Sequence, residues 1–235
     1  MSARRPSGFS QYRALLAKDV RQELRTREML VSMVLYALLV IVVYGVSLAF
    51  ARPGSDLLDV FAGLLWAMVV FTSLLGLNRS FSQEEENGCI EGLLLAPMDR
   101  GVIFLAKATS NLLFLLVVEV VSVPLFFLFF SDAAASASSA LLVAVPLLLG
   151  SVGIAGVGTL LATITASTRG RDVMLALLFV PVAFPLLYAC VSATSVLLVG
   201  GESLDGLAAS LALAAGYDVV MVLVSWLLYQ FVVGS

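Results

Sequence analysis

The fold is decided by the stretch MLVSMVLYALLVIVVYGVSLAF, residues 29–50. It contains no charged side chain, and its length of about 22 residues exceeds the roughly 20 that a helix needs to cross the hydrocarbon core of a bilayer. It is also longer than the apolar core of a signal peptide, which spans about 7–15 residues. We therefore expect a membrane span here and not a cleaved leader.

Further apolar stretches of spanning length follow along the chain: Asp59–Leu77, Ala108–Phe130, Ala140–Ala166, Val173–Gly200 and Leu207–Val232. Of the 235 residues, 61% are hydrophobic and only 12% are charged, against roughly 25% charged in a soluble domain. A soluble fold of this length could not keep so much apolar surface away from water. The sequence predicts an all-α membrane protein with six spans in residues 29–235, preceded by a cytoplasmic or interfacial helix in residues 1–28.

The basic residues predict the orientation of these spans. Twelve of the 13 Lys and Arg residues lie before the first span, between spans two and three, or between spans four and five. Only Arg52 falls on the other side. Because loops rich in Lys and Arg stay in the cytoplasm, we expect both termini to be cytoplasmic.

The segment before the first span is amphipathic. Its apolar residues recur at helical spacing and its basic residues fill the positions between them: Tyr12, Leu15, Leu16, Val20 and Leu24, against Arg13, Lys18, Arg21 and Arg25. Such a helix can lie in the headgroup layer with its cations toward anionic lipid. The alternative is a basic tail that only sets the orientation.

Two spans carry residues that shape helices. Val173–Gly200 would be about 42 Å long as an ideal helix, against a hydrocarbon core of about 30 Å. It contains Pro181 and Pro185, each of which removes a helix hydrogen bond, so we expect a kink or a helix that turns back. Small residues recur along the fourth span and favour close helix packing, with a hinge or a smooth wall as the alternative: Gly150, Gly153, Gly156 and Gly158.

Two carboxylic acids lie inside predicted spans. Glu119 and Asp218 are each about 17 Å from the start of their span, and therefore near the midplane. A charge at that depth costs about 2.5–3.5 kcal/mol, and no predicted span holds a Lys or Arg to pair with it. We expect both side chains to face the bundle interior, either as functional groups or in interhelical hydrogen bonds.

The longest break between spans is Asn78–Lys107, NRSFSQEEENGCIEGLLLAPMDRGVIFLAK. Its apolar residues Ile90, Leu93, Leu94 and Pro97 follow the spacing of one helix face. The acidic run Glu84, Glu85 and Glu86 precedes them, where the N-terminus of a helix favours negative charge. We predict a short amphipathic cytoplasmic helix, whose apolar side is covered either by the bilayer surface or by a partner protein.

This break resembles the coupling-helix region of ABC-2-type transporter permeases. The matching residues are Glu86, Gly88, Cys89, Ile90, Glu91, Leu93, Leu95, Pro97 and Lys107. The whole chain resembles the heme exporter protein B (CcmB) family of cytochrome c maturation in length and in number of spans. The turn Arg169–Gly170, followed by an aliphatic run and the two prolines of the fifth span, is similar to that family too. The departures are Cys89, where a small hydroxyl residue is usual, and Arg171, where a second glycine is common.

The resemblance implies a permease subunit in a bacterial inner membrane that couples ATP hydrolysis to heme export or to release of a heme-loaded chaperone. It also implies a homodimer, a separate ATPase of the CcmA type that binds the ATP, membrane partners of the CcmC and CcmD types, and indirect contact with a periplasmic heme chaperone. Heme would be cargo. The residues it assigns to ATPase coupling are Glu84, Glu85, Glu86, Gly88, Ile90, Glu91, Leu93, Leu94, Pro97 and Arg100.

Absent motifs narrow the function further. No G-x-x-x-x-G-K-[ST] phosphate loop occurs in the sequence, so we expect no ATP hydrolysis by this chain and no enzyme activity. The sequence contains no histidine, which excludes histidine-based zinc sites, Ser-His triads and histidine-ligated heme. We expect no metal, no bound cofactor and no nucleic-acid partner. Two alternatives stay open: an ABC-2 permease for a lipid, glycan or drug, and a secondary transporter that uses Glu119 and Asp218 as proton relays.

Overall fold

The computed structural model describes residues 7–49, 57–86, 99–130, 141–166, 168, 170–199 and 204–232. Its secondary structure over these residues is entirely helical. The helices are α1 (Gly8–Thr26), α2 (Glu28–Ala49), α3 (Leu57–Glu86), α5 (Arg100–Phe130), α7 (Ala144–Thr165), α8 (Arg171–Val199) and α9 (Leu204–Val232). All except α1 are long and apolar enough to cross a membrane, which confirms the predicted six-span α-helical class.

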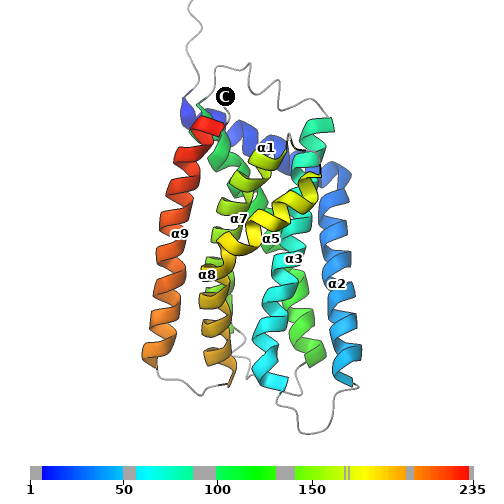
Figure 1. Cartoon of the computed structure of the whole chain (residues 1–235). Coiled ribbons are helices and arrows are strands. Elements are labelled where there is room, and N and C mark those ends of the chain that lie inside the picture. Colours follow the sequence, from blue (N-terminus) through cyan, green and yellow to red (C-terminus); the bar gives the residue numbers. More distant parts are fainter. Residues whose placement is uncertain are drawn as a thin grey trace, which may run out of the picture.

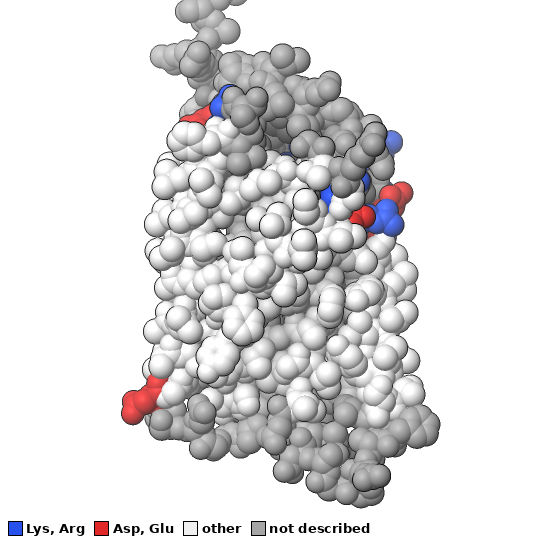
Figure 2. Space-filling view, in the orientation of Figure 1, with Lys and Arg blue, Asp and Glu red and all other residues white. Residues whose placement is uncertain are grey.

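The six long helices run side by side, and α1 lies across one end of the bundle, next to the end of α9 (Figure 1). We call this end the basic end, because the Lys and Arg residues of the described part lie on α1, at its corner with α2, near the end of α3 and in the first turns of α5 and α8. In the space-filling view, the visible Lys and Arg residues also lie at this end, and the surface between the two ends of the bundle carries almost no charged residues (Figure 2).

Helix α7 is the centre of the bundle and contacts α3, α5, α8 and α9. Its glycines face neighbouring helices so closely that an added Cβ atom would collide with a side chain: Gly150 with Trp66, Gly153 with Asp218 and Leu186, Gly156 with Val222, and Gly158 with Leu77. Small residues allow such close approach where lipid supplies no hydrophobic driving force between helices. The predicted close packing of this span is therefore observed.

The break predicted at residues 78–107 is much shorter in the structure. Helix α3 continues to Glu86, and α5 already begins at Arg100. The prediction was wrong because hydropathy marks where a helix leaves the apolar layer and not where the helix ends. No glycine or proline interrupts residues 78–86, and the first stop signals are Asn87 and Gly88.

The acidic run is affected by this correction. Glu84, Glu85 and Glu86 form the last turn of α3, so within the described residues they lie at the C-terminal end of a helix and not at an N-terminus. The other predicted coupling residues up to Pro97, including Leu93 and Leu94, lie outside the described residues.

Helix α8 carries both prolines of the predicted kink. It is one helix of 29 residues with Pro181 and Pro185 in its interior, and it changes direction part-way along its length in Figure 1. The kink is as predicted, whereas the alternative, a helix that turns back, is not observed in Arg171–Val199.

Candidate functional site

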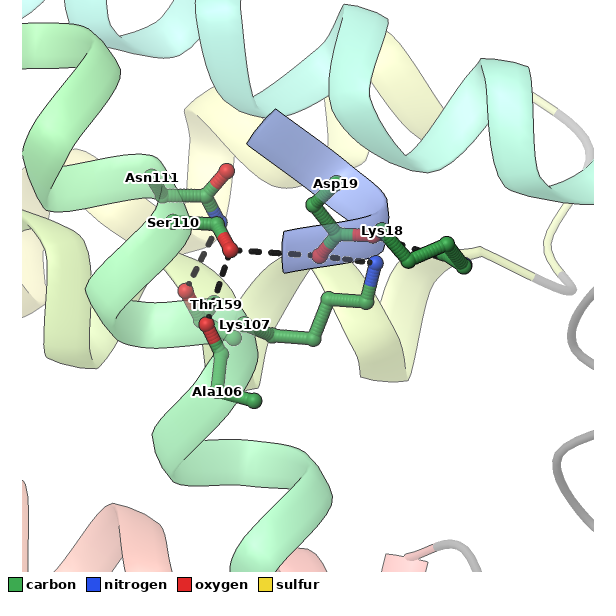
Figure 3. Close-up of polar contacts among 7 residues, drawn as sticks. All are labelled: Lys18, Asp19, Ala106, Lys107, Ser110, Asn111 and Thr159. Atoms are coloured by element: carbon green, nitrogen blue, oxygen red, sulfur yellow. Dashed lines mark hydrogen bonds and ion pairs between the residues drawn. The ribbon is translucent and has the colours of Figure 1, made fainter. Parts of the chain in front are cut away.

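A buried ion pair joins α1 to α5 at the basic end. Lys107 Nζ lies 2.8 Å from Asp19 Oδ2, and only 4% of the Lys107 side chain is exposed. The Ser110 hydroxyl lies 3.2 Å from the same carboxylate oxygen, and both contacts are drawn in Figure 3. About two turns along α1 toward its start, the Tyr12 hydroxyl donates to Thr109 Oγ1 at 3.2 Å.

The far end of α1 is attached to α2 by another acidic residue. Glu23 is buried, and its Oε1 accepts a hydrogen bond of 2.9 Å from the backbone N–H of Leu30, in the first turn of α2. The chain turns the corner at Arg27, whose φ of 57° places it in the left-handed region. Because the first N–H groups of a helix have no partner within the helix, Glu23 satisfies one of them from outside.

A small apolar core, separate from the main one, backs these polar contacts. It contains Leu15 of α1, Ile103, Phe104 and Ala106 of α5, Leu160 of α7 and Tyr229 of α9. We call it the basic-end core. The rings of Phe104 and Tyr229 are 5.4 Å apart, within the range of favourable aromatic contact. Four helices therefore meet around the first turns of α5.

The start of α5 is also fixed to α9. Arg100, the last of the predicted coupling residues, donates from Nη1 to the carbonyl oxygen of Gln230 at 3.1 Å. A cation at the C-terminal end of a helix is favoured by the helix dipole. Asp99 Oδ1 accepts from the N–H of Gly101 at 2.9 Å and caps α5. The chain thus enters α5 at a firmly held point.

Asp19 was not predicted as a site residue, and Lys107 was predicted only as a cation that sets the orientation and as part of the coupling-helix pattern. We call the buried contact of Asp19 with Lys107 the joint. One sequence signal pointed to it: Leu15, Asp19 and Glu23 are spaced by four residues and therefore share a helix face. That face is the one buried against the bundle, whereas Leu24, assigned to the apolar face, is 61% exposed.

A small cavity adjoins the ion pair. It has a volume of about 20 Å³ and is lined by Asp19, Gln22, Glu23, Met29, Ser80, Lys107 and Phe114. A polar cavity of this size has room for about one water molecule, and it is far too small for a porphyrin. Within the described ranges, no three His, Cys, Asp or Glu side chains lie together as a metal site would require.

Glu119 lies in the membrane interior between α5 and α7. It is 6% exposed, and its Oε1 accepts a hydrogen bond of 2.7 Å from the Ser151 hydroxyl. Nearer the basic end, Asn111 donates to Thr159 Oγ1 at 3.0 Å and also links α5 with α7. Interhelical hydrogen bonds of this kind contribute about 0.6 kcal/mol on average in a membrane.

Asp218 lies on the other side of α7. It is also 6% exposed, and neither of its carboxyl oxygens has a hydrogen-bond partner within the described residues. It faces Gly153, at which an added Cβ atom would strike its Oδ1. Ser151 and Gly153 are separated by about 200° around the helix. The structure therefore places Glu119 and Asp218 on different sides of α7 and does not bring them together.

These features define a polytopic helical membrane protein whose cations gather at one end, on and around an amphipathic helix. The sequence comparisons then give the family. The family described as "CcmB protein" matches residues 10–231, and the chain belongs to this family of heme exporter membrane subunits. The resemblance stated from the sequence is thereby confirmed.

Two relatives extend over most of the chain. Heme exporter protein B of Pseudomonas aeruginosa is 30% identical over 174 residues, which cover 74% of this chain and 75% of the relative. Heme exporter protein B of Rhodobacter capsulatus is 27% identical over 175 residues, covering 74% and 78%. Because three quarters of each relative is covered, the match extends across the bundle and is not confined to one motif.

Proposed function

We propose that this chain is the membrane subunit of an ABC-type transporter of cytochrome c maturation. In this proposal a separate CcmA-like ATPase binds to its basic end, and ATP hydrolysis there serves heme export or the release of a heme-loaded chaperone. The family match over residues 10–231 is the observation that carries the proposal. No phosphate-loop motif occurs in the sequence, so hydrolysis is assigned to the partner.

The basic end faces the cytoplasm of a bacterium, and the protein lies in its inner membrane. The bias of Lys and Arg toward that end supports this orientation. Exposed positions at the two ends provide the test: a thiol introduced by Asp205→Cys should react with an impermeant reagent added outside, and one introduced by Phe9→Cys should not. The reverse pattern would overturn the orientation.

The segment from Glu84 to Pro97 is the docking element for the ATPase. It begins in the last turn of α3 and leads toward the start of α5, and both of these points lie at the basic end. Leu93 and Leu94 are its apolar anchors in a groove of the ATPase, and Glu91 lies nearer the rim. Buried anchors of this kind commonly cost more than about 1 kcal/mol each when truncated.

A pull-down of the ATPase tests this docking. Leu93→Asp with Leu94→Asp should release the ATPase and leave the membrane abundance of this chain unchanged, because every span is intact. The matched control is Phe9→Asp with Leu24→Asp, two apolar residues of α1 that are 70% and 61% exposed. This control should retain the ATPase. Undiminished recovery with the Leu93 and Leu94 variant would refute the docking and favour a segment that rests on lipid.

Heme is the proposed cargo of the complex, and this chain transmits force to the complex without ligating the heme. Without histidine, the chain has no imidazole to offer the heme iron, and two cavities lined by described residues of α5 have volumes of only about 10 and 20 Å³. Ligation is therefore assigned to CcmC-like and CcmD-like partners and to the periplasmic chaperone. An ABC exporter needs two membrane halves, so this chain acts as a homodimer.

A further inference from the structure

The buried contact between α1 and α5 lies close to the proposed docking segment. That segment ends just before α5, which begins at Arg100. Lys107 follows seven residues later, about 10 Å along the helix. Since two turns of an α-helix behave as one stiff element, any displacement of the start of α5 moves the Lys107 side chain with it.

The ion pair is buried on both sides. The side chains of Lys107 and Asp19 are 4% and 9% exposed, and the pair is supported by the Ser110 hydroxyl and by the basic-end core around Leu15. Exposed ion pairs on a helix surface contribute little. A buried pair is different, because removal of one partner leaves an uncompensated charge in the interior.

The opposite end of α1 reaches the next span. Glu23 accepts a hydrogen bond from the N–H of Leu30, so α1 connects the start of α5 with the start of α2. In Figure 1 this helix lies across the ends of the spans and is not parallel to them. A helix in this position links two spans, α2 and α5, that are separated in the sequence.

We propose that the buried Asp19–Lys107 pair fixes α1 to α5, so that displacement of the docking segment moves α1 and the start of α2 together with α5. Asp19 and Lys107 are thus positioning residues for the transmission of force. The joint itself depends only on the structure, whereas its role in transmission rests on the proposed function.

The joint is tested by the reactivity of a buried position on α1. Leu15 is 7% exposed, so a thiol introduced by Leu15→Cys, in a background with Cys89→Ser and Cys190→Ala, should react slowly with a water-soluble maleimide. Lys107→Met should raise that rate by about tenfold or more, because Asp19 then loses its buried partner and keeps only the more exposed Lys18, at 3.4 Å, which favours undocking of α1. The thiol introduced by Phe9→Cys, at a position 70% exposed, provides the rate of full exposure.

Matched variants separate the pair from a general loss of charge. Lys18→Met removes the other cation that pairs with Asp19, at 3.4 Å, whose side chain is 37% exposed, and should leave the Leu15→Cys rate unchanged because a more exposed pair contributes little. The exchanged pair Asp19→Lys with Lys107→Asp, and the apolar pair Asp19→Leu with Lys107→Met, should both restore protection. Equal reactivity in wild type and Lys107→Met, or high reactivity in both paired variants, would overturn the joint.

The transmission of force from α5 to α1 and α2 is tested separately, by the amount of covalent c-type heme in cells. In cells that contain the ATPase, Lys107→Met should lower the formation of covalent c-type heme while pull-down still recovers the ATPase, and the exchanged pair should restore heme attachment. If Lys107→Met exposes the thiol at position 15 but leaves c-type heme normal at equal abundance, the proposed transmission is wrong. If the wild-type chain recovers no ATPase at all, the proposed function fails while the maleimide result still decides the joint.

Discussion

Buried acidic residues at the basic end and in the membrane interior of this molecule have different partners. At the basic end, Asp19 lies 2.8 Å from the ammonium group of Lys107 and 3.2 Å from a serine hydroxyl. In the membrane interior, Glu119 has only a serine hydroxyl, and Asp218 has no hydrogen-bond partner within the described residues. The buried acid at the basic end is paired with a cation, whereas the spans predicted from hydropathy contain no Lys or Arg that could pair with the two interior acids.

The difference shows what holds each region together. At the basic end, a directional ion pair and a small apolar core fix α1 in one place on α5. In the interior, the helices depend on close packing around α7, whose glycines leave space for neighbouring side chains. The first arrangement is suited to transmit a displacement, and the second lets long helices lie against one another with few polar contacts.

Removal of the buried cation Lys107 at the basic end should have the largest effect on stability. Lys107→Met should destabilise the chain by about 3–5 kcal/mol, because the Asp19 carboxylate loses its buried partner. Lys18→Met should change stability by less than about 0.5 kcal/mol, since it alters a more exposed pair. Unfolding of the purified protein in SDS, followed by tryptophan fluorescence, measures both. Equal effects would show that the buried pair has no special importance.

A change in the interior packing should have the next largest effect. Gly153→Ala places a methyl group against Asp218 and Leu186, and overpacking of this kind costs about 1–3 kcal/mol. Gly216→Ala is the control, because no atom lies within 4 Å of its added Cβ and alanine is the better helix former. The same SDS unfolding curves should order the variants as Gly153→Ala, wild type, Gly216→Ala in rising stability. Unchanged stability of Gly153→Ala would mean that α7 is not packed tightly here.

Loss of the interior hydrogen bond should cost less. Ser151→Ala removes the donor to Glu119, and such bonds contribute about 0.6 kcal/mol in a membrane, with a maximum near 1.7. The hydroxyl of Ser47 donates to the carbonyl oxygen of Val43 in its own helix, so Ser47→Ala serves as the comparison. A loss of stability as large as that of Lys107→Met would contradict the distinction between the two regions.

The smallest effect is expected at Asp218. Asp218→Asn keeps the shape of the side chain and breaks no hydrogen bond of the described structure, so stability should change by less than about 1 kcal/mol. The measurement is the unfolding curve together with the amount of c-type heme in cells. A large loss of heme attachment at normal stability would show that the carboxyl group has a functional partner in the assembled complex.

Hydropathy predicted the part of the fold that depends on the bilayer. Runs such as Met29–Phe50 must be helical to satisfy their backbone groups in lipid, and all six spans are present. Helix ends were predicted less well, because α3 continues to Glu86 in polar sequence that hydropathy does not register as helix. The kink of α8 was predictable, since proline has a direct geometric effect on a helix.

The polar contacts were harder to predict. Nothing in the spacing of a basic segment shows which cation will be buried, and the Asp19–Lys107 pair joins residues that are 88 positions apart. The difference between Glu119 and Asp218 depends on which side of α7 each one faces, and that follows from tertiary packing. The function of the predicted docking residues between Glu84 and Pro97 stays a prediction.

In the proposed function, force from an ATPase enters through the docking segment and serves cytochrome c maturation. The direct measurement is covalent c-type heme in a strain that lacks this gene, complemented at equal membrane abundance by the wild-type chain or by the variant Leu93→Asp with Leu94→Asp. Heme attachment should return with the wild type and stay low with the variant. Full restoration by the variant would contradict the claim.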